Sequence, residues 1–518
     1  MSTKFELAQG WSVWREVQLR SAGFPLHELL GLDDLSKFVH NPKLREAITW
    51  QNREVVSHSL DRVSTSKGWK KRRRSRAVTS YLQRYYSKNE QIGFFGPVAW
   101  ARFVQGEGRF EPSKDKLVAR STHFEMWAVQ TWAAYLANQP EMVPHLRPVL
   151  SPELYLDDGY VWGGTGCRNL ACKRRVTPED YALLVLCDGS RSVQELNDTD
   201  TLLRLLHKGL IELLPELAPD GYPERQLLEF LDSLPPETQT LKDRTRRFVQ
   251  LKENVGTAAG DAQALHQALD ELDQFFSETT TVDPSRNSGM TYGSRSLVYE
   301  DCQRELELEI PQSTLQDLAL PLAGVLQAAR WFTFEVAARH LLFLEEVFEK
   351  LSPSLGNEIA VSVFNRHLGD LFEKECNHLV DSIKDQLAEK WEQVFEGGRH
   401  LSRQEFEDRC RRIFEAPCPG WPGARHQSPD ILFCASDAQA FLRGEFTPVL
   451  GELHPGVNTW SIYCVYSRHP EPERLSAQYA EDGIAPGLGP VPWEHVTRCI
   501  QDGWLSDADY HILDHRGV

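Results

Sequence analysis

The sequence predicts an α+β protein made of several parts, in which helices and strands are segregated. Three observations lead to this prediction. Long stretches carry apolar residues at helical spacing, whereas the strand-like runs are short and bounded by glycine, proline and other turn residues. No regular βαβ alternation and no internal repeat is visible. The 518 residues are 41 % apolar and 25 % charged, which is ordinary for a packed globular chain and argues against overall disorder.

Composition and cysteine usage exclude several classes of protein. The formal net charge is −17, and the ten cysteines include no CxxC pair, which argues against a disulfide framework, a zinc ribbon or a thioredoxin-type redox pair. No stretch reaches the about 18 apolar residues of a membrane span, and the first residues lack a signal-peptide core. We therefore expect a cytoplasmic protein without a membrane span.

The first part, residues 1–152, is expected to be helical at its start and to end in strands. Apolar residues are spaced for a helical region over residues 1–65, and the helical period continues over 76–86. Glycines and a proline then bracket an aromatic pair at 93–97, which predicts a buried turn before a strand over 98–103.

A basic run interrupts this otherwise acidic chain. Seven of the ten residues from Lys67 to Arg76 are lysine or arginine. Weaker basic sets occur at Arg168 and 173–175, and at Lys242, Arg244, Arg246 and Arg247. If these sets converge in space they would suit a folded RNA, whose phosphates are read by shape. The alternative for the basic run is a solvated helix face.

The remaining parts differ in their patterns. Residues 153–217 predict a β-hairpin with its turn at 157–159, a third strand beginning near 170–172, and three short helices. Prolines at 215–236 indicate a linker, followed by an amphipathic helix over 261–276 and a loop over 277–290. Residues 291–518 predict a strand at 296–302, long helices at 323–349 and 364–396, a loop at 415–430, and strands at 431–434 and 446–450.

Short motifs do not identify an activity. The chain contains no phosphate-binding loop, no GxGxxG, no HExxH and no GxSxG nucleophile elbow. The 17 histidines are scattered, and His340, on an otherwise apolar helix, is interpreted as a core or interface residue.

Four longer segments, in order along the chain, resemble the lantibiotic dehydratase family. Residues 81–100, YLQRYYSKNEQIGFFGPVAW, resemble the N-terminal signature of that family, and residues 293–302, GSRSLVYEDC, look like its GRTLVYEDC segment. Residues 426–430 and 450–459 look like later blocks. The resemblance implies the fold of the family's N-terminal, glutamylation-type module, which takes an amino acid from an aminoacyl-tRNA and places it on a ribosomally made peptide.

Within this family the fate of the peptide differs. Full dehydratases add glutamate to Ser or Thr hydroxyls, and a separate module eliminates it. Smaller relatives, the peptide aminoacyl-tRNA ligases, add an amino acid to the peptide C-terminus with ATP. This chain has no room for an elimination module and is expected to stop before the glutamylation module usually ends. We therefore divide the chain into four parts. Residues 1–152 contain the basic run and the turn of the N-terminal signature, and residues 153–217 form a leader-recognition unit. Residues 218–290 are a helical linker region, and residues 291–518 are an α+β part that completes a truncated module.

The resemblance assigns two binding regions. A tRNA-binding face would use the basic run, namely Lys70, Lys71, Arg72, Arg73, Arg74 and Arg76. The unit at 153–217 is similar to the winged-helix domain that captures leader peptides by strand addition. Its expected peptide-binding residues are Cys172, Lys173, Arg174, Arg175, Leu202, Leu205 and Leu206. The alternative is a structural insert without a ligand.

Transfer from an aminoacyl ester needs positioning, a proton acceptor and donors for the developing oxyanion, and it needs no metal. The candidates inside the family-like segments are Arg84, Lys88, Asn89, Asp301 and Arg304. Lys88 stands where related dehydratases present arginine, and a lysine supplies a point charge instead of a bidentate fork. The alternatives are that Lys88 and Asn89 are turn residues and that Asp301 and Arg304 form a structural pair. His454 and Asn458 are interpreted as structural.

Two functions follow as hypotheses. The first is an aminoacyl-tRNA-dependent transferase that places glutamate or another amino acid on a precursor peptide, with aminoacyl-tRNA as co-substrate, no bound cofactor, and ATP only in the ligase-like case. The second is a non-catalytic scaffold that binds leader peptide or tRNA for another enzyme. The expected partners are the precursor peptide and tRNA. An elimination-type or complementary subunit and a homodimer are left open.

Overall fold

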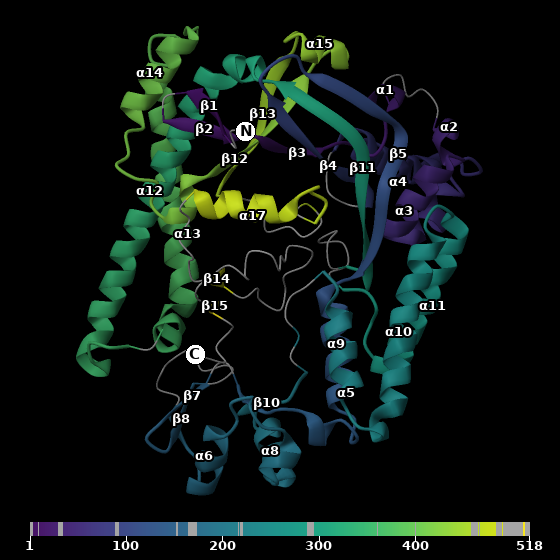
Figure 1. Ribbon diagram of the computed structural model, residues 1–518, viewed down its shortest axis with the longest axis vertical. Helices are drawn as coiled ribbons and strands as arrows, with labels where there is room; N and C mark the ends of the chain where they lie inside the picture. Colours follow the sequence, from purple (N-terminus) through teal and green to yellow (C-terminus); the bar gives the residue numbers. More distant parts are fainter. Residues whose placement is uncertain are drawn as a thin grey trace.

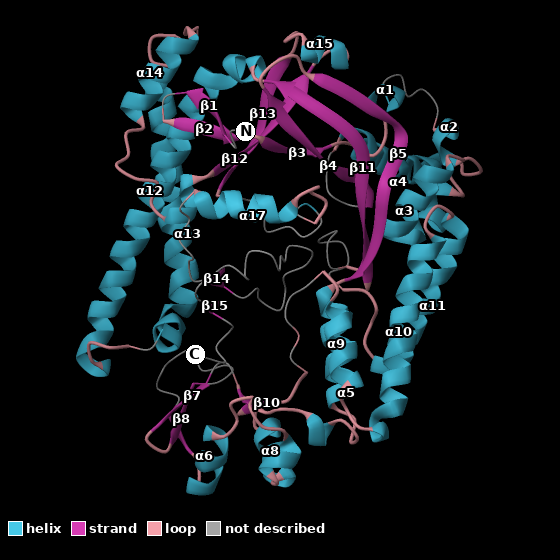
Figure 2. Ribbon diagram, viewed as in Figure 1, coloured by secondary structure: helices cyan, strands magenta, loops and turns pink. Residues whose placement is uncertain are grey.

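A four-stranded sheet organises the molecule (Figures 1 and 2). In this computed structural model, the described residues are 4–8, 10–29, 35–88, 93–151, 154–163, 173–215, 217, 221–286, 295–359, 361–398, 400–456, 465, 467–482, 489–490 and 511–512. No helix in these ranges has the length and apolar character to cross a membrane. The mixture of helices and segregated small sheets confirms the predicted α+β class.

The central sheet has the order β3-β4-β11-β5. Its strands are β3 (Glu16–Arg20), β4 (Gly93–Val104), β11 (Val298–Pro311) and β5 (Arg109–Phe124). β11 pairs in parallel with β4 and antiparallel with β5, so it lies between two strands that are consecutive in the sequence. Because β11 contains the second family-like segment, the sheet brings it beside the first.

The N-terminal region combines strands with helices. Its elements are β1 (Lys4–Ala8), β2 (Trp11–Trp14), α1 (Leu26–Leu29), α2 (Ser36–Val39), α3 (Pro42–Val55), a π-helical turn (Val56–Leu60) and α4 (Gly68–Ser87). The prediction of a helical region from residue 1 is wrong for residues 4–8, 11–14 and 16–20, which form β1, β2 and β3. Phe5 and Leu7 alternate with polar residues, and both are buried against the core near Phe103. This period of two is typical of a strand with one buried face.

A helical layer covers one face of the sheet at β5. It comprises α5 (Met126–Ala137), α9 (Pro223–Asp232), α10 (Gln239–Ala258) and α11 (Ala262–Thr280), with short 3₁₀ turns at Val143–His145 and Pro236–Thr238. Phe124, Trp132 and Phe248 stack at its centre, with ring centroids 4.4 and 4.2 Å from that of Phe248. The region read as a linker therefore contributes helices to the main core, because α9 to α11 bury their apolar faces against α5.

The unit at 153–217 contains three strands and three helices, as the sequence predicts. They are β7 (Leu154–Asp157), β8 (Tyr160–Gly163), β9 (Lys173–Arg175), α6 (Pro178–Val185), α7 (Val193–Leu196) and α8 (Thr199–His207), flanked by the pair β6 (Val149–Leu150) and β10 (Ile211–Glu212). Asp158 and Gly159 have φ of 44° and 77°, the positive values required by a two-residue hairpin turn. The predicted start of the third strand, 170–172, lies outside the described residues.

Two long helices, α12 (Ser313–Leu355) and α13 (Val361–Val394), confirm the two predicted near 323–349 and 364–396. In Figure 1 they run down the left side, and the first turns of α12 share an apolar cluster with Phe103 and Ile310 of the sheet. The elements that follow are α14 (Arg403–Ile413), a 3₁₀ turn (Pro422–Arg425), β12 (Gln427–Cys434), α15 (Ala438–Leu442), β13 (Thr447–Pro455), α17 (Pro472–Glu481), β14 (Gly489–Pro490) and β15 (His511–Ile512). β12 and β13 confirm the two later predicted strands, although both are longer than expected.

Candidate active site

The first two family-like segments meet at one end of the central sheet. Asp301 on β11 pairs in register with Gly93 of β4 on one side and with Ser121 of β5 on the other. α4 ends at residue 87, and the Lys88 backbone N–H donates to the Arg84 carbonyl as its C-terminal cap. Lys88 therefore lies five residues before the strand position beside Asp301. Asn89 lies outside the described residues.

Asp301 faces a buried histidine. The carboxylate is 5 % exposed, and its Oδ2 lies 3.9 Å from Nε2 of His123 on β5. The other ring nitrogen, Nδ1, lies 2.9 Å from the carbonyl of Gly221, so it carries the proton and donates to that oxygen. Burial lowers the pKa of His123, an effect that Asp301 partly offsets. A neutral imidazole with its Nε2 lone pair near a carboxylate is suited to accept a proton.

An arginine from a distant segment completes this group. Arg468 Nη2 donates to Ser121 Oγ at 2.5 Å, and its backbone carbonyl accepts from Gln303 Nε2 at 3.2 Å. Its Nε is buried and has no hydrogen-bond partner among the described residues. The positive charge of Arg468 also contributes to the lowered pKa of His123, after burial. One end of the sheet thus holds a carboxylate, a neutral imidazole and a guanidinium on the same face.

The opposite face of the same sheet end holds a different set of charges. Arg120 Nε donates to Glu300 Oε1 at 2.6 Å and also pairs with Glu46 of α3. Burial raises the pKa of Glu300 and raises that of the adjacent Cys302 thiol well above its usual value, so Cys302 is not a nucleophile at neutral pH. A polar cavity of about 350 Å³ lies beside Arg120 and Glu300. The ion pairs along it join the sheet to α3, which is a structural role.

Part of the chain is similar to a known protein family. Residues 40–164 match the family model described as lantibiotic dehydratase, N terminus. Over these residues the chain is similar to the N-terminal part of lantibiotic dehydratases. A search of the curated proteins finds no match.

Solved structures of lantibiotic dehydratases share the fold. The tRNA-dependent lantibiotic dehydratase MibB from Microbispora sp. 107891 is 14 % identical, with a TM-score of 0.58, over 90 % of this chain and 46 % of that one. The TbtB glutamylation domain from thiomuracin biosynthesis, bound to 5′-phosphodesmethylglutamycin, is 16 % identical, with a TM-score of 0.53, over 82 % of this chain and 54 % of that one. A second structure of that domain is 15 % identical, with a TM-score of 0.54, over 88 % and 57 %. This chain therefore spans about half the length of these structures, and its fold is similar to theirs.

The sequence predicted Asp301 for this group but not Ser121, His123 or Arg468. None of the three lies in a family-like segment. Only the strand register places His123 near Asp301, and only the path of the chain after β13 brings Arg468 there. The one feature of the sequence that could have indicated this site was a histidine, His123, at the end of a buried strand.

Arg304 makes hydrogen bonds away from the Asp301 group. Its Nε donates to Ser21 Oγ at 2.9 Å and its Nη2 to the Ala22 carbonyl at 3.1 Å. These bonds anchor the loop that follows β3, whereas Asp301 faces His123. Arg304 is therefore described better as a support for the sheet edge than as a group of the site.

The predicted tRNA face is partly correct in its geometry. Five of its six side chains are exposed on the first turns of α4, namely Lys70, Lys71, Arg72, Arg73 and Arg76. Arg74 is an exception, because its Nε donates to the His58 carbonyl at 2.9 Å and its guanidinium contacts Ser66. The basic run on α4 and the set at 173–175 lie apart: Figure 1 draws α4 in the upper half of the molecule and β8, the neighbour of β9, near the bottom.

The predicted peptide-binding residues are partly corrected as well. Leu202 and Leu205 on α8 are fully buried, because the apolar face of this short helix is used for the core. They are not available to a peptide, whereas Leu206 is only partly buried. Cys172 lies outside the described residues. Lys173, Arg174 and Arg175 form β9, an edge strand that pairs with β8 on one side.

The two later family-like segments pair with each other as β12 and β13. Ser428 is opposite His454, and Asp430, Glu452 and His454 place ligand-type atoms within 4.8 Å of one another. Such a group could hold a cation, but the Arg20 guanidinium is paired with Asp430, and His454 Nε2 lies 3.3 Å from Glu452. The arrangement is a charge network that joins this hairpin to β3.

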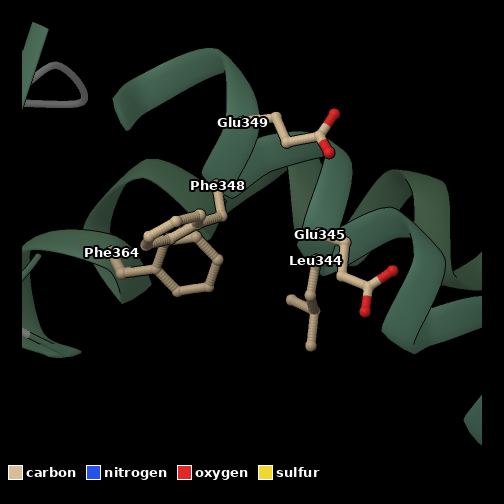
Figure 3. A pocket seen from close by; sticks show the side chains of 5 residues that line it. All are labelled: Leu344, Glu345, Phe348, Glu349 and Phe364. Atoms are coloured by element: carbon tan, nitrogen blue, oxygen red, sulfur yellow. The ribbon is translucent and has the colours of Figure 1, made fainter. Parts of the chain in front are cut away.

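A further pocket lies on the long helices, away from the sheet. Its volume is about 460 Å³, and Figure 3 shows the side chains that line it, Leu344, Glu345, Phe348, Glu349 and Phe364. Phe348 and Phe364 face each other with ring centroids 6.3 Å apart. Two carboxylates on an apolar floor do not supply the donors that acyl transfer requires.

Proposed function

We propose that this chain is an aminoacyl-tRNA-dependent transferase that places an amino acid on a ribosomally synthesised precursor peptide. The observation that carries the proposal is the grouping of Asp301, His123 and Arg468 at the sheet end where the family-like segment 81–100 enters β4. The likeness in fold to a tRNA-dependent dehydratase and to a glutamylation domain supports the same class of reaction.

The geometry suggests a division of labour for transfer to a hydroxyl group. His123 Nε2 accepts the hydroxyl proton as the hydroxyl oxygen bonds to the ester carbonyl carbon, and Asp301 stabilises the imidazolium that forms. The Arg468 guanidinium, with its buried Nε, donates to the oxyanion. The bond from the carbonyl carbon to the tRNA ribose oxygen then breaks, and His123 returns the proton to that oxygen. No ATP is needed, because the aminoacyl ester is already activated.

Two further regions supply the substrates in this proposal. The exposed basic residues at the start of α4 bind tRNA phosphates, since none of the five forms an ion pair with another residue in the described part of the chain. The edge strand β9, whose one partner strand among the described residues is β8, takes the leader of the precursor peptide by strand addition, in which main-chain hydrogen bonds supply affinity.

The test is intact mass spectrometry of a short precursor peptide from the neighbouring genes, incubated with this chain, charged total tRNA and ATP. We expect a gain of one amino-acid residue, and fragmentation then locates it on a hydroxyl or at the C-terminus. Asp301→Asn should lower the rate at least about 100-fold without weakening peptide binding. Glu305→Gln, at an exposed position of the same strand, is the matched control and should transfer normally.

The non-catalytic scaffold is the competing outcome. The open edge of β9 lies in a separate unit from the Asp301 group, so leader binding does not require a working transfer site. Bound peptide without any gain in mass, with charged tRNA present, would favour the scaffold and reject the transferase.

A further inference from the structure

The segment that carries Arg468 crosses the whole central sheet. We name the described residues 467–482, which include α17, the strap. Val465, just before the strap, and Arg468, near its start, contact side chains from three of the four strands of the central sheet. Trp100 Nε1 of β4 donates to the Val465 carbonyl at 3.1 Å, and Gln303 of β11 donates to the Arg468 carbonyl. Ser121 of β5 accepts from the Arg468 guanidinium.

The remaining strand, β3, contributes Glu16. Its carboxylate lies 4.0 Å from His469 Nε2 and 3.7 Å from Arg474 Nη2, and its side chain is 11 % exposed. The Nδ1 atom of His469 accepts the Glu471 backbone N–H at 2.9 Å, so the ring proton lies on Nε2, toward Glu16. The ring also packs edge-on against Trp100, with centroids 4.6 Å apart. His469 is therefore held from two strands.

Glu16 is charged in this environment. Burial by itself would raise the pKa of Glu16, but His469, Arg474 and Arg15 outweigh it and lower the pKa. A buried carboxylate retained in its charged form needs partners, and two of these three partners belong to the strap. Removing the charge would leave Arg474 with Glu471 as its remaining ion-pair partner in the described residues.

The far end of the strap is fixed independently. Trp14 Nε1 donates to Asp482 Oδ2 at 2.7 Å, Lys4 pairs with the same carboxylate, and Arg425 donates to the Asp482 carbonyl at 2.9 Å. Loss of the Glu16 contacts would therefore loosen the Arg468 end while α17 stays attached. This makes a local effect on Arg468 separable from loss of the strap.

We propose that Glu16 is a positioning residue, which acts through His469 and Arg474 to set the Arg468 guanidinium against Ser121 and next to His123. His469 directly follows Arg468, so a shift of the ring moves the peptide from which the guanidinium extends. The inference rests on the proposed transfer function for its kinetic consequence. A misplacement of about 1 Å at a reacting site can cost about 100-fold in rate.

The test combines kinetics with amide hydrogen exchange of the full chain. Glu16→Gln should lower kcat for transfer about 10- to 100-fold, with the KM for aminoacyl-tRNA nearly unchanged. In an Arg468→Ala background it should have no further effect, because a residue that acts through Arg468 has nothing left to position. Amides of residues 467–474 should exchange faster, while those of β4 and β11 stay protected. Glu473→Gln, at an exposed position of the strap, is the control and should alter neither measurement.

The outcomes separate the two proposals. The positioning role would be overturned if the fold decreases in kcat caused by Glu16→Gln and Arg468→Ala multiply in the double variant. It would also be overturned if Glu16→Gln changes neither kcat nor hydrogen exchange. If the unmodified chain transfers no amino acid, the proposed function fails. Hydrogen exchange still tests whether Glu16 holds the Arg468 end of the strap. If the amides of residues 467–474 are protected equally in Glu16→Gln and Glu473→Gln, that result alone overturns this inference.

Discussion

The basic run at 67–76 and the basic set at 242–247 look alike in sequence but differ in the structure. Near the start of α10, three of the four basic side chains have partners within the protein: Lys242 donates to the Leu234 carbonyl at 2.7 Å, Arg244 to the Tyr135 hydroxyl, and Arg246 to Asp232 at 2.7 Å. Near the start of α4, five side chains are exposed, and within the described part of the chain Arg74 is the one member of that set whose side chain hydrogen-bonds to other residues. The density of lysine and arginine therefore indicates a binding surface only after the intramolecular partners are counted.

The difference follows from packing. α10 lies among α9, α11 and α5, so its basic side chains meet a carbonyl and a carboxylate near the end of α9 and a tyrosine hydroxyl on α5. α4 buries the second half of its length, through Val78, Leu82, Tyr85 and Tyr86, and its first turns extend beyond that core. The same residue types are thus structural on one helix and available on the other.

The largest expected effect is on the free energy of unfolding and concerns α10, whose basic side chains bind other groups within the protein. Lys252 of α10 is 4 % exposed and pairs with Glu224 at 2.7 Å and Glu253 at 2.8 Å. Lys252→Met should lower the free energy of unfolding by about 3–5 kcal/mol, because it leaves the buried Glu224 carboxylate unpaired. Urea denaturation followed by circular dichroism measures this. Combining it with Glu224→Gln should recover part of the loss, and equal stability of the single variant and the parent would refute the structural role.

The pH dependence of that pair has a definite sign. Burial would lower the pKa of Lys252, but Glu224 and Glu253 outweigh burial and raise it above its ordinary value. The lysine is therefore charged at neutral pH, and its contribution to stability is complete below the unfolded pKa. It is lost only as the pH rises through the raised pKa of the folded state.

The next effect compares the two helices directly. Arg72→Glu with Arg73→Glu on α4 should weaken binding of total tRNA about 100-fold at low salt and reduce the salt dependence of log K by roughly 1.5–2. Arg244→Glu with Arg246→Glu on α10 changes the net charge by the same amount and is the matched control, with tRNA affinity expected to stay near that of the parent. Filter binding across a salt series measures both. Equal losses from the two pairs would mean that net charge, not the α4 surface, governs binding.

The smallest expected effect concerns Arg74, the basic residue of α4 that is hydrogen-bonded within the protein. Arg74→Ala should lower the free energy of unfolding by about 1–2 kcal/mol, because it removes charge-assisted hydrogen bonds to the His58 carbonyl and to Ser66. The salt dependence of tRNA binding should not change. Thermal denaturation and the same binding assay test this together. A variant with parental stability and a reduced salt slope would place Arg74 with the exposed residues instead.

Local patterns were sufficient for much of the fold. The long helices α12 and α13, the caps at Thr177 and Ser192, and the hairpin of β7 and β8 follow from periodicity and turn chemistry within a few residues. The first 20 residues were misassigned, because a helical apolar period further on was extended back over short alternating strands. The peptide-binding role of Leu202 and Leu205 failed for a similar reason, since one apolar face of α8 cannot both form a core and bind a ligand.

The sequence by itself determined the α+β class, the two long helices, the family resemblance and one residue of the candidate site, Asp301. Only the tertiary structure decided what surrounds that residue. His123 reaches it through strand register, because β11 inserts between β4 and β5. Arg468 reaches it from more than 160 positions away along the chain, through a strap held by Glu16 and Trp100. Contacts of that range depend on how whole elements pack, and residue spacing along the chain carries no record of it.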